Sequence, residues 1–571
     1  MVNSDQKTTH FAICLGLFVT AVLLRAIGAD FGFFNGDERV NDSARFLAGE
    51  LVPTQHFYPP FFNYLNGVAF VGLFVFGMLF DMWSNTGEFR QVYFDDPTPF
   101  YVTARYVTAV IGALSAPLFF SCARRVGLSL GGAFVVGAFA AVLPIAVFMA
   151  HIAKGDTGLA TACLAVVWAF LMRLETRNIR RWDVIIGITV ALAFGFKQSA
   201  LLVLAPLALG MIVVLARRES LGQAFRSFGM SVLVLLVLWP LMNIGILLDI
   251  EGFLAFQNIQ TVMSVREEDP FGIGLPITLR IFGDTVTGLN PILFAISLVA
   301  PVWLLAKTCR LDLRDALLAI WIANVVSVIV ISLTVGTRQP EHLFLPNLTI
   351  QLLLAAIVLA DMIRVYVNIP KLIVVVTACA GFLLMALGSA NVLQQAVVQP
   401  VAAQLVTYLA ETYPEARVQS GLALPVPQTV AAQKMEFDRF DRLGRKYEID
   451  MPEIAEERFL AENAENALFW VNAPFAMSGL EGDETQKADF PVQPHAWPIQ
   501  PEEWKLDTWI AQDFDVFVVN DFDYLLAESR STFIRDFHAE LLDRCDRARD
   551  YKARKPLFLE FDITVFDCSA L

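Results

Sequence analysis

The 571-residue chain contains few charged residues and few of the side chains that usually hold metal ions. Asp, Glu, Lys and Arg make up 17% of the sequence, which has six histidines and seven cysteines. It shows no glycine-rich phosphate loop, no recognisable cluster of metal ligands and no internal repeat. These absences argue against a P-loop nucleotide site and against a transporter built from two related halves, and they give no indication of a metal centre.

Long apolar runs are what the chain has in abundance. Hydrophobic residues make up 56% of it, and its mean hydropathy is +0.56. A membrane span needs about 20 mostly apolar residues, and residues 11–29, 228–248 and 343–360 meet this requirement. The first run follows a short polar stretch and precedes no small-residue cleavage site, so we expect it to be a retained span. The sequence predicts an α-helical polytopic membrane protein with 11 to 13 spans.

The net charge of −14 is concentrated after residue 400. This acidity predicts a boundary between a membrane domain, residues 1–391, and a soluble domain, residues 392–571. The second domain has the pattern of an α/β fold. We expect its helices at 401–412 and 524–542 and its strands at 468–471, 516–519 and 557–565. Nucleic acid is not an expected partner, because a phosphate backbone requires a basic surface.

Five clusters of basic residues lie between apolar segments, and such clusters accumulate in cytoplasmic loops. They lie at residues 124–125, 173–181, 217–226, 307–314 and 364–371. The alternate connections and the C-terminal domain are then outside, which in a bacterial inner membrane means the periplasm. The apolar run 61–80 does not fit this alternation. We expect it to be tilted and re-entrant, or to be paired with an undetected break.

The cysteines fall into two groups. Five lie in or beside apolar segments, where a thiol is usually a small packing group: Cys14, Cys122, Cys163, Cys309 and Cys379. Cys545 and Cys568 stand alone in the C-terminal domain. If that domain is extracytoplasmic, these two can form a disulfide, and otherwise they remain free thiols.

Ionisable residues at the outer ends of the spans are the candidate site residues, because charge near lipid is costly unless it is paired, solvated or functional. Asp37 and Glu38 follow the first span, and His56 and Tyr58 precede the run at 61–80. A carboxylate pair with a nearby histidine can take a proton from an acceptor nucleophile. A solvated pair of loop carboxylates is the alternative.

Further charged residues gather at the same predicted face. They are Arg105, Lys154, Asp156, Lys197, Arg338 and His342. Cations that converge on one face suit an anionic substrate such as a lipid phosphate. The alternative for each is a side chain that extends to the membrane interface or anchors a helix there.

The order of these motifs resembles the GT-C fold glycosyltransferases of the protein mannosyltransferase and aminoarabinose transferase type. The resemblance covers roughly residues 10–365. The matching pieces are the Asp37-Glu38 pair, Tyr58-Pro59-Pro60-Phe61, Ala104-Arg105-Tyr106, Asp156-Thr157-Gly158, Phe196-Lys197-Gln198 and His342-Leu343-Phe344. Two pieces depart from the family pattern: Tyr58 stands where Lys or His is common, and Gln198 where we expect Gly.

The resemblance implies a role for each of these residues. Asp37 becomes the general base, Glu38 its support and Asp156 the second acidic site residue. The residues implied to bind the donor phosphate or the substrate are Arg105, Lys197, Arg338, His342, His56, Tyr58 and Lys154. The donor is a polyprenyl-phosphate sugar, transfer inverts the anomeric centre, and the acceptor is a lipid, a glycan or a protein. No cofactor is required, because lipid phosphate is a good leaving group, although a divalent metal remains compatible.

Three other functions remain open from the sequence. A transporter or lipid flippase predicts charges near the bilayer midplane. A non-catalytic subunit for assembly of an envelope polysaccharide predicts that Asp37 is dispensable. A related polymerase or ligase would use a lipid-pyrophosphate donor instead.

Overall fold

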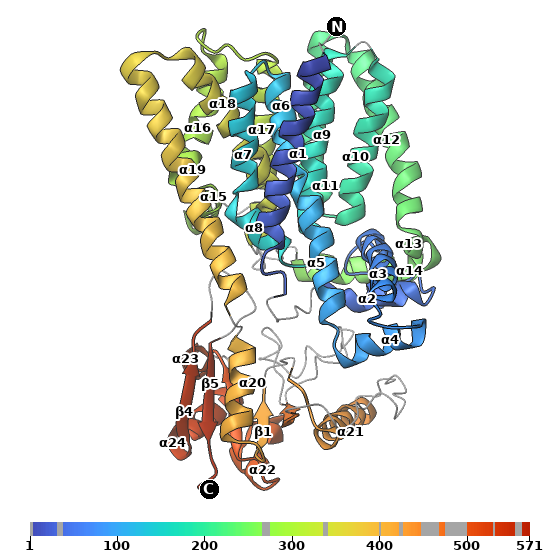
Figure 1. Ribbon diagram of the computed structural model, residues 1–571, viewed down its shortest axis with the longest axis vertical. Coiled ribbons are helices and arrows are strands. Elements are labelled where there is room, and N and C mark those ends of the chain that lie inside the picture. Colours follow the sequence, from blue (N-terminus) through green and yellow to red (C-terminus); the bar gives the residue numbers. More distant parts are fainter. Residues whose placement is uncertain are drawn as a thin grey trace. The chain divides into compact units, whose positions relative to one another are not determined.

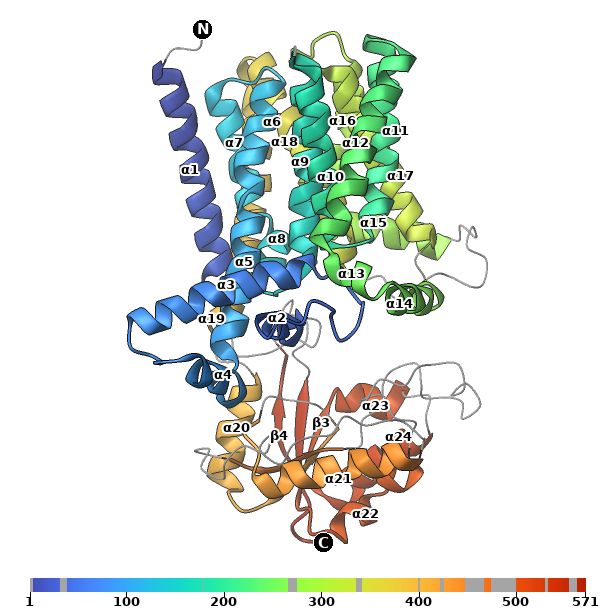
Figure 2. The same cartoon turned by 90° about the vertical axis from the view of Figure 1, so that its right-hand side faces the viewer.

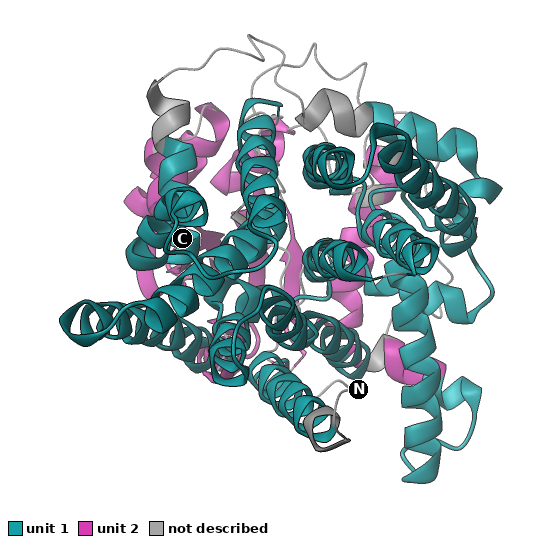
Figure 3. Ribbon diagram, turned by 90° about the horizontal axis from the view of Figure 1, so that it is seen from above, with its two compact units in different colours: residues 1–29, 36–89, 98–396 teal, residues 30–35, 90–97, 397–571 magenta. Residues whose placement is uncertain are grey.

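A computed structural model describes residues 4–30, 38–176, 178–264, 275–334, 341–398, 401–421, 426–446, 467–473, 500–528, 532–553 and 562–571. The chain forms two compact units (Figure 3). The first contains residues 1–29, 36–89 and 98–396, and the second contains residues 30–35, 90–97 and 397–571. The sequence boundary predicted after residue 391 falls inside the last helix of the first unit, Asn368–Val397.

The described part of the first unit is built from helices (Figure 1). Its helices are α1 (Ser4–Ala26), α2 (Val40–Leu47), α3 (Phe61–Leu79), α5 (Thr98–Ala113), α6 (Ser115–Arg125), α7 (Leu130–Ala141), α8 (Pro144–Ala150), α9 (Gly155–Glu175), α10 (Ile179–Phe196), α11 (Ala200–Arg218), α12 (Leu221–Met242), α13 (Ile244–Leu248), α14 (Ile250–Ser264), α15 (Leu275–Leu289), α16 (Pro291–Leu305), α17 (Arg314–Thr334), the 3₁₀ turn η2 (Glu341–Phe344), α18 (Leu345–Val365) and α19 (Asn368–Val397). Helix α4 (Thr86–Asp95) crosses the division between the units.

Among the described residues, nine helices are long and apolar enough to span a membrane, and the number rises to 11 when two bent pairs are included. The pairs are α7 with α8, bent by 52°, and residues 280–289 of α15 with α16, bent by 108°. The result meets the lower end of the predicted range of 11 to 13. In the α18 span 94% of the residues are buried, so this helix lies inside the bundle. In the α12 span only 6% are buried.

Helix α3 is long and apolar enough to span, yet it lies across one end of the bundle. It is viewed end-on in Figure 1 and lengthwise in Figure 2, while the spanning helices run vertically in both. This orientation matches the tilted alternative expected for residues 61–80. Helix α10 does run along the bundle between α9 and α12. It is not among the nine helices counted above, because its first turns contain three charged residues. The count of 11, which includes the two bent pairs, therefore stays the same among the described residues when α10 replaces α3.

The basic clusters meet at one end of the bundle, as the alternation of inside and outside loops predicts. Arg125 after α6 reaches Glu175 at the end of α9, at 3.3 Å. Arg173 binds Glu219, which follows α11, and Arg218 binds Asp315 at the start of α17. Arg364 of α18 donates to the carbonyl of Gly127, at 2.7 Å. These contacts join the predicted inner loops to one another and confirm that they share one end.

The second unit contains a five-stranded sheet in the order β2-β1-β3-β5-β4. Its strands are β1 (Arg417–Ser420), β2 (Phe469–Asn472), β3 (Val516–Asn520), β4 (Asp546–Tyr551) and β5 (Ile563–Asp567). Strand β1 pairs in parallel with β2 and β3, and β5 pairs antiparallel with β3 and β4. The predicted α/β class is therefore confirmed for this region.

Helices cover both faces of this sheet. On one face α20 (Val401–Thr412) packs Leu405 and Leu409 against Val418 and Val516. On the other face α22 (Leu506–Ile510) and α24 (Thr532–Arg544) bury Trp509 and the residues around Phe517. Between them in sequence lie α21 (Val430–Lys446), the turn η5 (Pro501–Trp504) and α23 (Phe522–Glu528).

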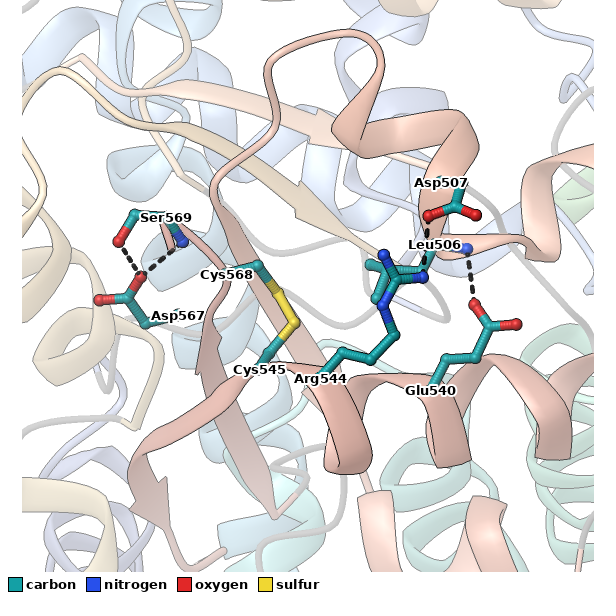
Figure 4. The surroundings of a disulfide bond; sticks show 8 residues. All are labelled: Leu506, Asp507, Glu540, Arg544, Cys545, Asp567, Cys568 and Ser569. Atoms are coloured by element: carbon teal, nitrogen blue, oxygen red, sulfur yellow. Dashed lines mark hydrogen bonds and ion pairs between the residues drawn. A yellow bond between two sulfur atoms is a disulfide. The ribbon is translucent and has the colours of Figure 1, made fainter. Parts of the chain in front are cut away.

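Cys545 and Cys568 form a disulfide, which decides between the two states expected for them. Figure 4 shows the bond joining the end of α24 to the residue after β5. On the same helix, Arg544 pairs with Asp507 at 2.8 Å. The other five cysteines are free, and Cys122, Cys163 and Cys309 are buried as expected.

Candidate active site

Eight of the ten predicted site residues lie in the described part of the chain, at the end of the first unit opposite the basic loops. They are Glu38, His56, Tyr58, Arg105, Lys154, Asp156, Lys197 and His342. Asp37 and Arg338 lie outside the described residues. Their hydrogen bonds, ion pairs and ring contacts gather them into three groups.

The first group has a buried ion pair at its centre. Asp156 stands in the first turn of α9, and Lys197 directly follows α10. The Lys197 ammonium donates to Oδ1 of Asp156 at 2.7 Å. The side chain of Asp156 is 2% exposed and that of Lys197 is 14% exposed. Oδ2 of Asp156 is buried without a hydrogen-bond partner, so this carboxylate keeps acceptor capacity in the structure as described.

Three further side chains surround this pair. Nζ of Lys154 lies 3.4 Å from Nε2 of His342. The ring of Tyr58 has the Lys197 ammonium 5.2 Å from its centroid and that of Lys154 at 5.9 Å. We call these five residues the lysine cluster: Tyr58, Lys154, Asp156, Lys197 and His342. Two ammonium groups accompany one carboxylate, so the cluster carries a net positive charge even with a neutral histidine, and it can attract an anion.

Two glycines allow the start of α9 to come this close to Lys197. A Cβ on Gly155 would lie 2.6 Å from the carbonyl oxygen of Phe196, and one on Gly158 would lie 2.4 Å from the Phe196 ring. Contacts this short do not occur between real side chains, so only glycine fits both positions. The Asp156-Thr157-Gly158 motif found in the sequence therefore serves close packing as well as charge.

Arg105 and Glu38 form the second group, and they bind each other. Nε and Nη2 of Arg105 each donate to a different carboxylate oxygen of Glu38, both at 2.8 Å, and both side chains are at most 1% exposed. Nη1 donates to the carbonyl of Ala29 at 2.8 Å, and the backbone N–H of Ala153 donates to Glu38 at 2.9 Å. The sequence places Arg105 on the donor phosphate, whereas the structure places its guanidinium in this buried pair.

His56 belongs to the third group, with a partner that the sequence analysis missed. Its Nε2 lies 2.7 Å from Oδ2 of Asp249, and its ring packs edge-on against Phe253 of α14. This hydrogen bond lowers the pKa of Asp249, which also accepts from the N–H of Gly252 at the start of α14. Asp249 directly follows the apolar run 228–248. This position at the outer end of a helix was the sequence signal that could have identified it as a candidate site residue.

An apolar groove of about 400 Å³ lies between α9, α10, α11 and α12. Phe194 and Leu201 line one end of it, and they lie three residues before and four residues after Lys197 in the sequence. Asp183 and Ser227 line the other end, where they join the buried network of Arg173. The groove has the character of a site for a single apolar chain. Among the described residues, no three His, Cys, Asp or Glu lie where they can share a metal ion.

Residues 101–243 match the family model described as dolichyl-phosphate-mannose-protein mannosyltransferase. Over these residues the chain is similar to the GT-C glycosyltransferases of this type. The matched segment carries Arg105, Lys154, Asp156 and Lys197, and it includes in full all four helices that line the groove. The resemblance noted from the motifs is thus confirmed. No curated protein sequence matches the chain.

Several solved membrane structures are similar to this chain. ArnT from Cupriavidus metallidurans bound to undecaprenyl phosphate aligns over 99% of this chain and 98% of its own, with 15% identity and a TM-score of 0.49. Archaeal oligosaccharyltransferase AglB from Archaeoglobus fulgidus, in complex with an inhibitory peptide and a dolichol-phosphate, aligns over 91% and 70%, with 12% identity and a TM-score of 0.45. The S. cerevisiae protein O-mannosyltransferase Pmt1-Pmt2 complex bound to the sugar donor aligns over 44% and 35%, with 18% identity and a TM-score of 0.35.

Proposed function

We propose that the chain is an integral membrane glycosyltransferase that moves a sugar from a polyprenyl-phosphate donor to a lipid, glycan or protein acceptor. The observation that carries this proposal is the lysine cluster, whose Lys197 lies on the connection between α10 and α11, two of the helices that line the apolar groove. A positive site on the connection between two groove helices fits a ligand with an anionic head and a hydrocarbon tail. The family match over residues 101–243 supports the same class of donor.

The donor binds with its phosphate at Lys154 and Lys197 and its polyprenyl chain between α10 and α11. The Tyr58 ring holds both ammonium groups nearby through cation–π contacts. Asp156 partly neutralises the site before the donor arrives, so the two lysines are not left as unpaired buried cations. The Lys154 ammonium donates toward Nε2 of His342, which orients it within the cluster.

Transfer proceeds by direct displacement. Asp37 accepts a proton from the acceptor hydroxyl or amine while that oxygen or nitrogen forms a bond to the anomeric carbon. The bond from the anomeric carbon to the phosphate oxygen breaks, and its electron pair leaves with the lipid phosphate. Lys154 and Lys197 stabilise the charge that develops on this leaving group. The anomeric configuration inverts because the attack occurs opposite the departing oxygen. Arg338 is a further phosphate contact in this proposal.

The active site faces the periplasm of a bacterial inner membrane in this proposal. The inner ends of the spans carry the basic loops, and the lysine cluster lies at the opposite end of the same unit. The disulfide between Cys545 and Cys568 supports an oxidising compartment for the C-terminal domain.

Transfer by the purified protein from a panel of polyprenyl-phosphate sugars tests the proposal. We expect turnover by the wild type and a loss of at least about a hundredfold in kcat with Asp37→Asn, because general-base catalysis contributes that much. Lys197→Met should abolish saturation by the donor. An absence of turnover with every donor, from folded protein supplied with lipid, glycan and peptide acceptors, would contradict the proposal and favour a transport or assembly role.

A further inference from the structure

The guanidinium of Arg105 in α5 binds the connection between α1 and α2 at two residues. It donates to the carbonyl of Ala29, just after α1, and with two N–H groups to Glu38, just before α2. Glu38 accepts in turn from the backbone N–H of Ala153. Ala153 is the residue before Lys154, so this network ends one residue from the lysine cluster.

His151 connects the same segments at a second point. Its Nε2 lies 2.7 Å from the carbonyl oxygen of Ile27, and its Nδ1 lies 2.8 Å from that of Val147 in α8. The side chain is fully buried. The short non-helical stretch between α8 and α9 is thereby attached to Ile27, just after α1, at residue 151 and to Glu38, just before α2, at residue 153.

We infer that Arg105, Glu38 and His151 are positioning residues that fix Lys154 and Asp156 for binding of the donor phosphate. The inference rests on the proposed function, and it gives Arg105 and Glu38 a different task from the one expected from the sequence. A two-pronged pair between Arg and a carboxylate fixes direction as well as distance, which lysine cannot do. Displacement of a binding group by about 1 Å can cost about a hundredfold in rate.

Breaking a buried ion pair destabilises a fold wherever the pair lies, and the C-terminal domain supplies a control for that effect. Arg439 of α21 binds Glu503 with two N–H groups, at 2.8 and 2.7 Å, and its side chain is 7% exposed. Arg439→Lys therefore removes a comparable two-pronged contact outside the first unit. Arg105→Lys removes the one that holds Ala153.

Both lysine variants are compared with the wild type in donor-dependent transfer and in thermal unfolding. We expect each to lower the apparent Tm, but only Arg105→Lys to lower kcat/KM, by about a hundredfold. Glu38→Gln provides a second variant, because it keeps an oxygen for the Ala153 N–H and loses the charge. We expect it to give an intermediate loss of kcat/KM.

A readout that needs no turnover is the acylation rate of Lys154 by an amine-reactive reagent, followed by peptide mass spectrometry. Lys154 is 2% exposed. We expect its acylation to accelerate at least about tenfold in Arg105→Lys and to stay at the wild-type rate in Arg439→Lys. Equal kcat/KM in the two variants, or unchanged acylation of Lys154 in Arg105→Lys, would overturn the inference. If the wild type transfers no sugar, the proposed function fails, while the acylation rates still decide whether Arg105 positions Lys154.

Discussion

At the residue scale, the chemistry of the candidate site depends on a charge pair whose partners come from α9 and from the connection between α10 and α11. Asp156 and Lys197 are 41 positions apart, and two glycines let their backbones approach. The carboxylate is nearly inaccessible to water, so its charge depends on the lysine. Removing either partner therefore lowers the stability of the fold, and this effect is separate from the partner's role in transfer.

A double variant separates these two contributions. Lys197→Met leaves the Asp156 carboxylate buried and unpaired, and we expect it to lower the free energy of unfolding by roughly 3–5 kcal/mol. Adding Asp156→Leu removes that charge and should restore most of the apparent Tm without restoring transfer. Thermal unfolding in detergent checks the order of the three proteins. A double variant no more stable than Lys197→Met would show that the pair is not the source of the stability.

The close approach at Gly158 gives a second prediction. Gly158→Ala forces the Phe196 ring away from a Cβ that would otherwise lie 2.4 Å from it, and Lys197 follows Phe196 directly. We expect a lower apparent Tm and a higher KM for the donor. Gly131→Ala is the control, because a Cβ there meets nothing within 4 Å. That variant should retain wild-type KM, and the same loss from both variants would rule out the packing explanation.

His538 predicts an acid-sensitive fold in the C-terminal domain. Burial lowers the pKa of His538 to about 4, whereas an unfolded histidine titrates near 6.5. Between these values the unfolded chain binds the extra proton, so stability falls as the pH decreases from about 6.5 toward 4. The full loss is roughly 3 kcal/mol. The apparent Tm at pH 7 and pH 4.5 should change less in His538→Phe than in the wild type, and an equal change would exclude this histidine as the cause.

At the element scale, the sequence predicted helices and strands best where apolar residues are continuous. The predicted helix 401–412 coincides with α20, and the runs at 468–471 and 516–519 lie within one residue of β2 and β3. Part of the run 557–565 lies outside the described residues, and β5 covers its end. The predicted helix 524–542 corresponds to α23 and α24, with residues 529–531 outside the described chain.

Strands β1 and β4 and helix α21 are among the described elements of the second unit that the sequence analysis did not predict, for physical reasons. Strand β4 has the sequence Asp-Arg-Ala-Arg-Asp-Tyr and lies at the edge of the sheet, where charged side chains remain in water. Strand β1 is four residues long, too short for an alternating pattern, although it lies between β2 and β3. Helix α21 has a polar composition that resembles a loop. Strand order and edge position depend on tertiary pairing, which a local pattern does not contain.

The same limit applies to the candidate site. Ionisable residues at the outer helix ends singled out Lys154, Asp156, Lys197 and His342, and the Tyr58-Pro59-Pro60-Phe61 piece of the family resemblance added Tyr58. It did not reveal that Arg105 pairs with Glu38, 67 positions away, or that Asp249 pairs with His56, 193 positions away. The type and location of a charged residue predict that it has a functional or structural role. Which residue it pairs with is determined by how the helices pack.

At the scale of the whole first unit, the arrangement of basic loops predicts which ends are accessible from which side of the membrane. Glu251 in α14 and Gly222 at the start of α12 are both exposed and lie at opposite ends of α12. In intact cells, an impermeant maleimide should label Glu251→Cys and should label Gly222→Cys only after permeabilisation. The reverse pattern would invert the proposed orientation, and equal labelling would contradict the assignment of these positions to opposite sides.

The transverse position of α3 has a consequence for biosynthesis. If α3 does not cross, the described crossings number 11, and an odd number places the two ends of the first unit on opposite sides of the membrane. In the proposed orientation, the last 170 or so residues are exported only after α19 has been inserted. Cys545 and Cys568 must then travel as thiols and meet an oxidant on the far side. A cell without a functional thiol-oxidation system in that compartment would insert the helical bundle normally and fail at the last step of maturation.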